Sequence, residues 1–365
     1  MTKVCHITSV HPAHDVRIFH KECTSLAKAG FDVTLVCANA ETEEKNGVHI
    51  VGVDAKSNSR AARALSTVNR VYDRAKEVDA DIYHLHDPEL LRVALKLKNA
   101  GKKVIFDVHE DLPRQIMSKY WIPKPLRLTA SKAAEKLEQT ICKRLDAIVA
   151  VTKFIATRFQ EINKNTVIIN NYPLEHEIAS EQQTGEKENT VCYFGSISHI
   201  RGLKNLVDAM DLTGETTLSL AGSWSPEAFR TDLEKSTGWK RVDFLGSVGR
   251  EDVGRIMRQS KAGIVTFLPE PNHINAQPNK MFEYMSAGLP VIGSNFPLWK
   301  EIIEGNKCGL CVDPDNSNEI AEAINYISNN SEAAALMGEN GRKAILDKYN
   351  WESESVKLTT LYEAL

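Results

Sequence analysis

Residues 275–301 hold the side chains with the clearest chemistry in this chain. Pro278 suits the first turn of a helix, where a missing N–H costs nothing, and Gly288 marks the end of that helix. The start of a helix presents unpaired N–H groups and the positive end of its dipole, and Lys280 adds a full positive charge there. Glu283 comes one turn later, where its carboxylate could accept hydrogen bonds from hydroxyl groups. The pattern predicts a site for a phosphate with a sugar hydroxyl beside it, as in a nucleotide sugar.

A second candidate phosphate site is the segment from Gly195 to Gly202, which joins an apolar strand to a helix. Its small residues, including Ser196 and Ser198, let backbone N–H groups approach a phosphate, and the planar guanidinium of Arg201 can bind two phosphate oxygens. The alternative is an ordinary strand-to-helix turn with a surface arginine. We favour phosphate binding, because cations that converge on a diphosphate stabilise it as a leaving group.

Two histidine motifs follow predicted strands. His109 lies just beyond Asp107, and open parallel sheets bind ligands at the carboxyl ends of their strands. It could contact a ligand, or it could be hydrogen-bonded within its own loop. His84 and His86 alternate at the end of another strand, and we expect them to point to opposite faces, so that a shared metal ion is not expected. We interpret this second motif as structural.

Around Glu283 the segment Q-P-N-K-M-F-E, followed by G-L-P-V-I, resembles the E-x7-E region of the retaining GT-B glycosyltransferases of family 4. The resemblance extends over the whole chain and is strongest at residues 5–30, 104–112, 193–206 and 275–303. It implies a GT-B fold, in which two Rossmann-like domains face a central cleft. It also implies transfer of a sugar from a nucleotide-diphosphate sugar with retention of configuration.

The resemblance further implies roles for donor-side residues. Glu283 matches the glutamate that binds the donor ribose, whereas the first glutamate of the motif is replaced by Asn275, which could hold a hydroxyl of the transferred sugar. Arg201 matches the second of two cations that hold the diphosphate, and Ser196 stands where the first would be. The expected donor-binding residues are Gly195, Ser196, Ser198, Arg201, Asn279, Lys280 and Glu283.

The expected catalytic residues lie beside the donor sugar and around the diphosphate. His109 resembles the histidine that family members place beside the donor sugar, and it joins Asn275, Arg201 and Lys280. The two cations and the helix start would neutralise the departing diphosphate, so that neither a divalent metal nor a cofactor is required.

The loop after the first predicted strand borders the acceptor in this family. We therefore expect acceptor contacts from His14, Asp15 and Arg17. Arg17 could pair with an acceptor phosphate. Asp15 could instead cap the following helix, and Arg17 could lie on the surface.

Apolar runs alternating with amphipathic segments must position these residues. Short apolar runs predict strands at residues 4–8, 33–36, 48–53, 82–85, 104–107, 147–151 and 167–169. After the polar residues 171–190, which are typical of a linker, the pattern resumes with strands at 191–194, 217–221, 242–245, 263–267, 291–293 and 309–312. Helical segments between the strands indicate parallel sheets covered on both faces.

We therefore predict an α/β chain of two Rossmann-like domains, residues 1–172 and 190–349. The resemblance implies that a last helix, about residues 350–365, returns to the first domain. The loop V-H-P-A-H-D-V-R after the first strand lacks the G-x-G-x-x-G fingerprint, which argues against a nicotinamide or flavin enzyme.

Composition excludes other classes. The 365 residues, 42% hydrophobic and 25% charged, are typical of a soluble globular protein, and a net charge of -3 gives no sign of nucleic-acid binding. The 7 cysteines lie mostly in apolar runs, which suits a reducing cytoplasm, and we interpret Cys308 and Cys311 as a strand end rather than a zinc ligand pair. Without a signal-peptide segment or an apolar run of membrane-spanning length, we expect a cytoplasmic protein.

Residues 119–144 are basic, with Lys or Arg at positions 119, 124, 127, 132, 136, 143 and 144 against Glu at 135 and 138. Tyr120, Trp121 and Ile122 lie at the start of this segment. Basic residues with interfacial aromatics suit peripheral contact with an anionic membrane; the alternative is a solvated helix face. Membrane contact would fit a polyprenyl-linked acceptor, and a glycan acceptor is the other possibility.

Two other functions compete with sugar transfer. A nucleotide-sugar epimerase of the same fold would need acid and base residues around the sugar and no acceptor, and the basic segment argues against it. A non-catalytic nucleotide-sugar-binding protein is favoured by Asn275 and Ser196, which replace charged residues of the family pattern. The donor, a UDP- or GDP-sugar, and the acceptor do not follow from the sequence, although bacterial surface polysaccharide synthesis is the commonest setting of the family.

Overall fold

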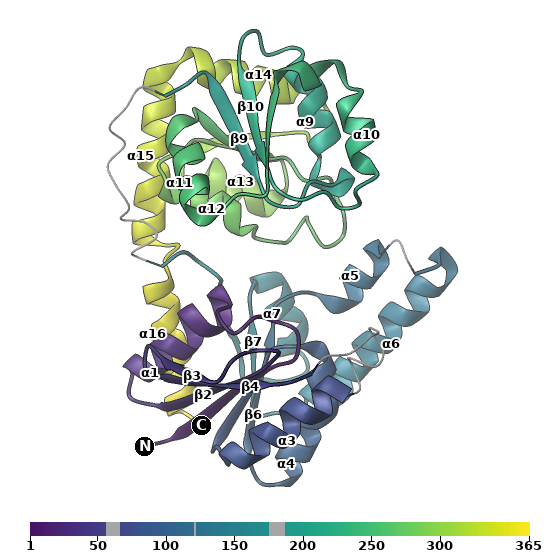
Figure 1. Ribbon diagram of the computed structural model, residues 1–365, viewed down its shortest axis with the longest axis vertical. Helices are drawn as coiled ribbons and strands as arrows, with labels where there is room; N and C mark the ends of the chain where they lie inside the picture. The colour runs from purple at the N-terminus through teal and green to yellow at the C-terminus, as the bar shows by residue number, and fades with distance from the viewer. Residues whose placement is uncertain (56–65, 120–121, 175–186) are drawn as a thin grey trace. The chain divides into compact units, whose positions relative to one another are not determined.

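The computed structural model describes residues 1–55, 66–119, 122–174 and 187–365, and it has the predicted α/β architecture (Figure 1). The chain forms two compact units. Unit 1 comprises residues 1–171 and 351–365, and unit 2 comprises residues 172–350. Each unit is built on its own sheet, so each positions its own set of side chains. Most of the segment expected to be a linker lies outside the described residues.

Unit 1 contains an eight-stranded sheet in the order β3-β4-β2-β1-β5-β6-β7-β8. Neighbouring strands are parallel except β3 and β4. The strands are β1 (Lys3–Thr8), β2 (Asp32–Ala38), β3 (Glu43–Lys45), β4 (Val48–Val53), β5 (Ile82–Leu85), β6 (Lys103–Val108), β7 (Ala147–Ala150) and β8 (Thr166–Ile168). All but β3 correspond to predicted apolar runs; β3 was missed because its residues are charged and exposed.

The helices of unit 1 cover this sheet and include the end of the chain (Figure 1). They are η1 (Val16–Cys23), α1 (Thr24–Lys28), α3 (Val68–Val78), η3 (Pro88–Leu90), α4 (Leu91–Asn99), α5 (Leu112–Ser118), α6 (Lys124–Cys142), α7 (Lys153–Gln160) and α16 (Trp351–Glu363). Helix α16 contacts α1 and η1, and the indole N–H of Trp351 donates to the hydroxyl of Ser25 at 2.9 Å. Within the described residues, none of the helices combines the length and the apolar character that crossing a bilayer requires.

Helix η1 is a π-helix that buries both apolar and charged side chains. Asp15 caps its start, because Oδ1 accepts the N–H groups of Arg17 and Ile18 at 2.9 Å each. A π-helix brings residues five positions apart close to the same face, and Arg17 and Glu22 are both buried in this way. These charges meet side chains from the carboxyl ends of β5 and β6.

Unit 2 contains a six-stranded parallel sheet in the order β11-β10-β9-β12-β13-β14. The strands are β9 (Thr190–Phe194), β10 (Thr217–Ala221), β11 (Val242–Gly246), β12 (Ala262–Val265), β13 (Val291–Ser294) and β14 (Gly309–Val312). The helices are η4 (His199–Arg201), α9 (Leu203–Met210), α10 (Phe229–Glu234), η5 (Thr237–Arg241), α11 (Arg250–Gln259), α12 (Asn279–Ser286), α13 (Pro297–Ile303), α14 (Ser317–Asn329) and α15 (Ser331–Asp347).

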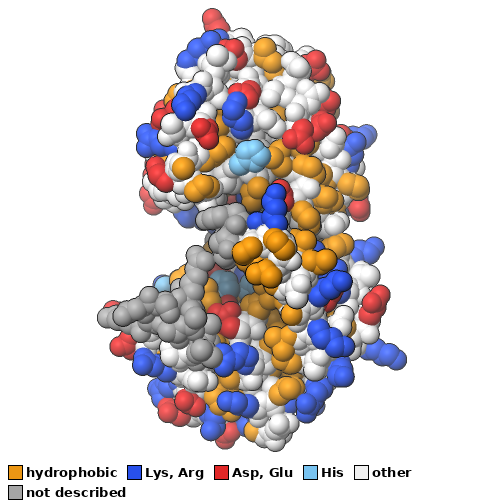
Figure 2. All heavy atoms as spheres, turned by 90° about the vertical axis from the view of Figure 1, so that its right-hand side faces the viewer, with side chains coloured by type: hydrophobic (Ala, Val, Ile, Leu, Met, Phe, Trp, Pro, Cys, Tyr) orange, Lys and Arg blue, Asp and Glu red, His pale blue; other side chains and the backbone are white. Residues whose placement is uncertain are grey.

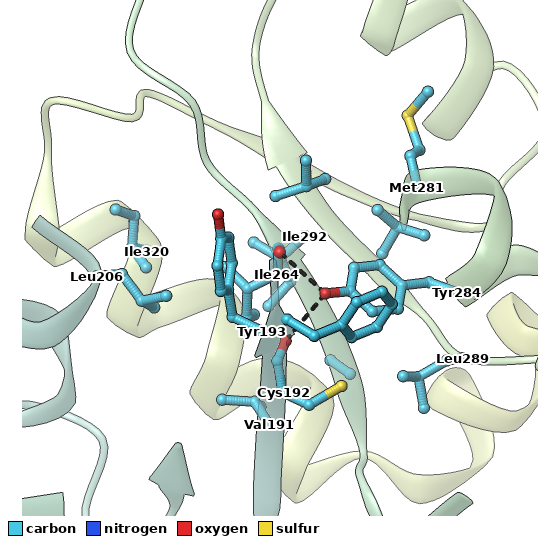
Figure 3. Packing of buried hydrophobic residues seen from close by; sticks show 14 of the residues in the cluster. Val191, Cys192, Tyr193, Leu206, Ile264, Met281, Tyr284, Leu289, Ile292 and Ile320 are labelled. Atoms are coloured by element: carbon cyan, nitrogen blue, oxygen red, sulfur yellow. Dashed lines mark hydrogen bonds between the residues drawn. The ribbon is translucent and has the colours of Figure 1, made fainter. Parts of the chain in front are cut away.

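Helix α12 is fixed on this sheet by buried side chains. The hydroxyl of Tyr284 donates toward the carbonyl oxygens of Cys192 in β9 and Ile264 in β12, at 3.4 and 3.3 Å (Figure 3). Gly263 makes room for that ring, since a Cβ there would lie 2.2 Å from it. The helix ends as predicted at Gly288, which has a φ of 64°, while the N–H of Leu289 reaches the carbonyl of Tyr284. The start of α12 is therefore held at the carboxyl edge of β9 and β12.

Candidate functional site

Lys280, in the first turn of α12, directs its ammonium group at aromatic rings and a glycine loop. Nζ lies 3.6 Å from the ring centroid of Tyr193 and 5.4 Å from that of Phe267. It also lies 3.1 Å from the position a Cβ would take at Gly195. No carboxylate of the described residues forms an ion pair with this ammonium group. Burial, and then the nearby charge of Arg201, lower the pKa of Lys280 well below its ordinary value, although the charge of Glu283 acts in the opposite direction.

Arg201 shares the same aromatic platform. Its guanidinium carbon lies 4.2 Å from the ring centroid of Phe267, so Phe267 contacts both cations. Gly202 allows the following helix to start here: its φ is 73°, and a Cβ would lie 1.8 Å from the carbonyl oxygen of Thr266. Sequence reasoning missed Phe267, although an aromatic residue just beyond a buried strand was a visible signal.

The glycine loop from Gly195 to Ser198 is held at both ends by neighbouring strands. The N–H of Gly195 donates to the carbonyl of Ala221 at 2.9 Å. The carbonyl of Ser196 accepts a hydrogen bond from the hydroxyl of Tyr193 at 2.7 Å, and Ser196 is exposed. Ser198 is buried, and its carbonyl accepts the N–H of Arg201. Of the predicted donor residues, Gly195, Arg201 and Lys280 thus come together, whereas the contacts of Ser198 are those of a structural residue.

Gly222 is expected to be indispensable to this loop. Its φ is 147°, and a Cβ would lie 1.7 Å from the carbonyl oxygen of Gly195. Gly222→Ala should therefore displace the loop and lower the free energy of unfolding by about 1–3 kcal/mol. Urea unfolding measures this effect. Gly249→Ala is the matched control, since nothing lies within 4 Å of its Cβ position; equal effects of both variants would contradict the steric argument.

The remaining donor-side residues lie in and before α12. Glu283 is partly buried, and its Oε1 accepts from Arg250 Nη1 at 2.8 Å. Asn275 is partly exposed in the loop between β12 and α12. That loop is anchored by the indole N–H of Trp299, which donates to the carbonyl of Ala276 at 2.7 Å. Asn279 is exposed as the first residue of the helix.

In unit 1, two His–Asp pairs lie at the carboxyl edge of the sheet. His109 Nε2 lies 2.9 Å from Asp107 Oδ2, and His11 Nδ1 lies 2.8 Å from Asp87 Oδ1. The two imidazole rings are 5.2 Å apart. The hydrogen bond to Asp87 raises the pKa of His11, so this ring favours the cationic form. The expectation that His109 lies at a ligand-binding edge fits this position, and His11 is an additional polar group beside it.

Arg17 is one of the residues predicted to contact the acceptor. It is buried, not exposed, and its Nε and Nη2 donate to the two oxygens of Asp107 at 2.9 Å each. Nη1 donates to the carbonyl of Ile169 at 3.0 Å. A guanidinium committed in this way favours a structural role for Arg17 over contact with an acceptor phosphate.

The other two acceptor candidates lie nearer the surface. Asp15 uses its Oδ1 to cap η1, as described above, so an acceptor would have to bind through Oδ2. His14 is 40% exposed and lies 2.9 Å from Glu43 Oε1.

The expectation that His84 and His86 point to opposite faces of the sheet is wrong. Alternate residues of a strand share a face, and their rings stack with centroids 4.6 Å apart. Both lie in a fully buried cluster with His6 and Glu22.

Two family models match the chain in succession. "Glycosyltransferase Family 4" matches residues 16–171, and "Glycosyl transferases group 1" matches residues 175–344. Among curated relatives, O-antigen chain mannosyltransferase C of Escherichia coli is 22% identical over 314 residues, covering 83% of this chain and 80% of the relative. Two uncharacterized glycosyltransferases of Methanocaldococcus jannaschii are each 25% identical to this chain. The match to the first covers 49% of this chain and 45% of the relative, and the match to the second covers 60% of each.

Solved structures resemble the whole chain. Sucrose-phosphate synthase from Thermosynechococcus elongatus has a TM-score of 0.78 at 17% identity, covering 100% of this chain and 99% of the other. Anabaena HepE in complex with UDP-glucose has a TM-score of 0.75 at 16% identity, covering 100% of both chains. At this identity the likeness establishes the fold alone.

Proposed function

The chain belongs to the GT-B glycosyltransferases of group 1, and from that premise we propose that it moves a sugar, with retention of configuration, from a nucleotide-diphosphate sugar to an acceptor. One observation carries the donor assignment: Lys280 and Arg201 converge beside Gly195 on the ring of Phe267, and no carboxylate of the described residues pairs with Lys280. A diphosphate would supply the missing anion. The relatives suggest a role in polysaccharide synthesis, such as that of the O-antigen mannosyltransferase.

The proposed mechanism is stabilisation of the leaving group. Lys280, Arg201 and the N–H groups at the start of α12 would neutralise the charge that develops on the diphosphate as the bond to the sugar breaks. No divalent metal is then needed at the diphosphate. The chain has two Asp-x-Asp tripeptides, residues 79–81 and 313–315, and a carboxylate of each accepts a backbone N–H: Asp81 that of Lys3, and Asp313 that of Asp315.

Three further residues would position the sugar nucleotide. Glu283 would exchange its exposed partner Arg250 for the ribose hydroxyls, since a surface ion pair contributes little. Asn275 has an amide, which can donate and accept hydrogen bonds but cannot act as a carboxylate nucleophile or base. We assign it to a hydroxyl of the transferred sugar, and we assign His109 to a hydroxyl of the sugar or the acceptor.

A panel of nucleotide sugars tests this proposal. The solved complex of HepE contains UDP-glucose, and the Escherichia coli relative is a mannosyltransferase, so the panel starts with UDP-glucose and GDP-mannose. The true donor should raise Tm in a concentration-dependent way and release free sugar slowly without an acceptor. A Tm shift without any hydrolysis or transfer would favour the binding-only function. Conversion of the donor into its epimer would identify an epimerase.

Donor binding is expected to be coupled to proton uptake at Lys280. In the free protein its pKa is lowered, so at alkaline pH part of the population is neutral. A bound diphosphate raises that pKa. UDP affinity should therefore fall as the pH rises from the pKa of Lys280 in the free protein to its pKa in the UDP-bound protein. Calorimetric UDP titrations at about pH 8 and above, where phosphates have lost their second proton, should show net proton uptake in buffers of different ionisation enthalpy. Lys280→Met should abolish the uptake; its persistence would assign the proton to another group.

We also propose a peripheral membrane contact through α5 and α6. Figure 2 shows hydrophobic and basic side chains side by side on the face that carries these helices. Leu126 and Leu137 are 58% and 49% exposed, on the same helix as the exposed Lys124 and Lys132. The aromatic pair Tyr120 and Trp121 lies outside the described residues. Apolar side chains surrounded by lysines suit an anionic bilayer surface and a polyprenyl-linked acceptor.

Co-sedimentation with anionic vesicles measures this contact. Leu126→Gln with Leu137→Gln should reduce binding several-fold, as should Lys124→Glu with Lys132→Glu, and binding of the unmodified protein should weaken with salt. Leu212→Gln is the matched control, since Leu212 is 50% exposed in unit 2. If all these variants sediment alike, the segment is an ordinary solvated surface.

A further inference from the structure

Three histidines and a glutamate meet in the interior of unit 1, behind the His109–Asp107 pair. His6 comes from β1, Glu22 from η1, and His84 and His86 from β5 and the residue after its end. His6 and His84 are direct neighbours in the parallel pairing of β1 with β5, so their rings point to the same face. All four residues are buried, with an exposed fraction of at most 1%. Sheet register therefore creates a cluster that the proposed sugar transfer does not use.

The ligand atoms of this cluster all lie within 4.8 Å of one another. Glu22 Oε2 lies 4.0 Å from His6 Nδ1, 3.8 Å from His84 Nδ1 and 3.9 Å from His86 Nε2. His6 Nδ1 lies 2.8 Å from His86 Nε2. Tetrahedral ligands at 2.0–2.1 Å from zinc are about 3.3 Å apart, which falls between these values. A single carboxylate oxygen nearly equidistant from three imidazole nitrogens is the arrangement of a metal site.

Hydrogen bonding within the cluster is incomplete. Both carboxylate oxygens of Glu22 and Nε2 of His84 are buried without a hydrogen-bond partner among the described residues. Arg17 Nε forms an ion pair with Oε1 at 3.0 Å but leaves Oε2 directed at the nitrogens. A buried polar atom without a partner costs stability, and a cation at the centre would remove that cost for Glu22 Oε2.

We propose that unit 1 binds one Zn²⁺ ion through His6 Nδ1, His84 Nδ1, His86 Nε2 and Glu22 Oε2. Imidazole and carboxylate ligands suit this metal, and four protein ligands make a closed, structural site. The surrounding groups also fit, because ligating histidines usually bind a carboxylate or another polar group through their second nitrogen. Asp107 Oδ2 lies 3.3 Å from His86 Nδ1, and the hydroxyl of Tyr362 lies 3.2 Å from His6 Nε2.

Two hydrogen bonds must be given up when the metal binds, and the first is the one between His6 Nδ1 and His86 Nε2, both of which would become ligands. The hydroxyl of Tyr362 lies 2.7 Å from His84 Nδ1, the atom that would ligate zinc, and it can retain His6 Nε2 as its partner. The ion would tie β1, η1 and β5 together and, through Tyr362, α16 as well. Because the site is buried, it would be filled during folding rather than afterwards. It goes beyond the proposed function, since none of the four ligands is among the residues assigned to the donor or the acceptor.

Metal content of the intact chain tests the proposal. Protein refolded from denaturant with Zn²⁺ and then gel-filtered should retain about one equivalent by mass spectrometry. Its Tm should exceed that of protein refolded with chelator by several degrees. Refolding with Co²⁺ should give the intense visible absorption of a tetrahedral site. Sub-stoichiometric zinc together with identical Tm values in zinc and chelator would overturn the proposal.

Two variants place the ion within the cluster. His84→Gln should lower retained zinc at least tenfold, whereas His109→Gln should retain it, because His109 belongs only to the alternative group of His86, Asp107 and His109. His49→Gln, with a 53% exposed side chain, controls for zinc on the surface. Loss of zinc in His109→Gln or His49→Gln instead of His84→Gln would contradict the assignment. If His84→Gln fails to fold, zinc content and Tm of the unmodified chain decide the question, and neither depends on sugar transfer.

Discussion

Lys280→Met is expected to lower kcat for sugar transfer by about 10²- to 10³-fold, the effect of removing one preorganised group that stabilises developing charge. The same change should leave the free energy of unfolding equal or higher, since it replaces a desolvated ammonium group, which lacks a carboxylate partner among the described residues, with an apolar side chain of similar length. Loss of activity without loss of stability separates a leaving-group role from a structural one. Steady-state kinetics with the true donor and urea unfolding give the two quantities.

The control for this prediction is Lys204→Met. Lys204 is 40% exposed in α9 and pairs with Asp208 one turn away, so both activity and stability should change little. Arg201→Met should resemble Lys280→Met in kcat, because both cations contact Phe267. Activity of Lys280→Met within about threefold of the unmodified enzyme would show that the diphosphate is neutralised elsewhere.

Arg17→Gln is expected to destabilise unit 1 by about 3–5 kcal/mol, because it leaves the buried, charged carboxylate of Asp107 without the guanidinium that binds both of its oxygens. Burial alone would raise the pKa of Asp107, but Arg17 and His109 hold it well below its usual range, so this carboxylate is charged in the folded protein. Arg17 binds both oxygens of Asp107 and lies 3.0 Å from Glu22 Oε1. Chemical unfolding monitored by circular dichroism measures the loss.

Arg74→Gln provides the matched control in the same unit. Arg74 is 48% exposed and pairs with Glu77 on the surface of α3, so its replacement should cost less than about 1 kcal/mol. If Arg17→Gln instead keeps full stability and raises only the KM for the acceptor, the original expectation of an acceptor-binding arginine is correct and the structural role is wrong.

Local sequence signals predicted the elements and the residues of the proposed donor site. The apolar runs became parallel strands, because β-branched and other apolar residues in short runs must be buried on both faces of a covered sheet. Helix α12 begins after Pro278 and ends before Gly288, both of which act through their own backbone geometry. Lys280 and Arg201 could be assigned because a helix start and a glycine loop define phosphate chemistry within a few residues.

Contacts between distant segments were beyond the reach of the sequence. Arg17 follows a helix cap and looks like a surface residue, yet its partner Asp107 is 90 positions away. Phe267 became a platform for two cations only because β12 lies next to β9. The four-residue cluster depends on the register of β1 against β5, which a shift of one residue would reverse. Propensity and capping are properties of neighbouring residues, whereas register, burial and ion pairing depend on which strands the folded chain places side by side.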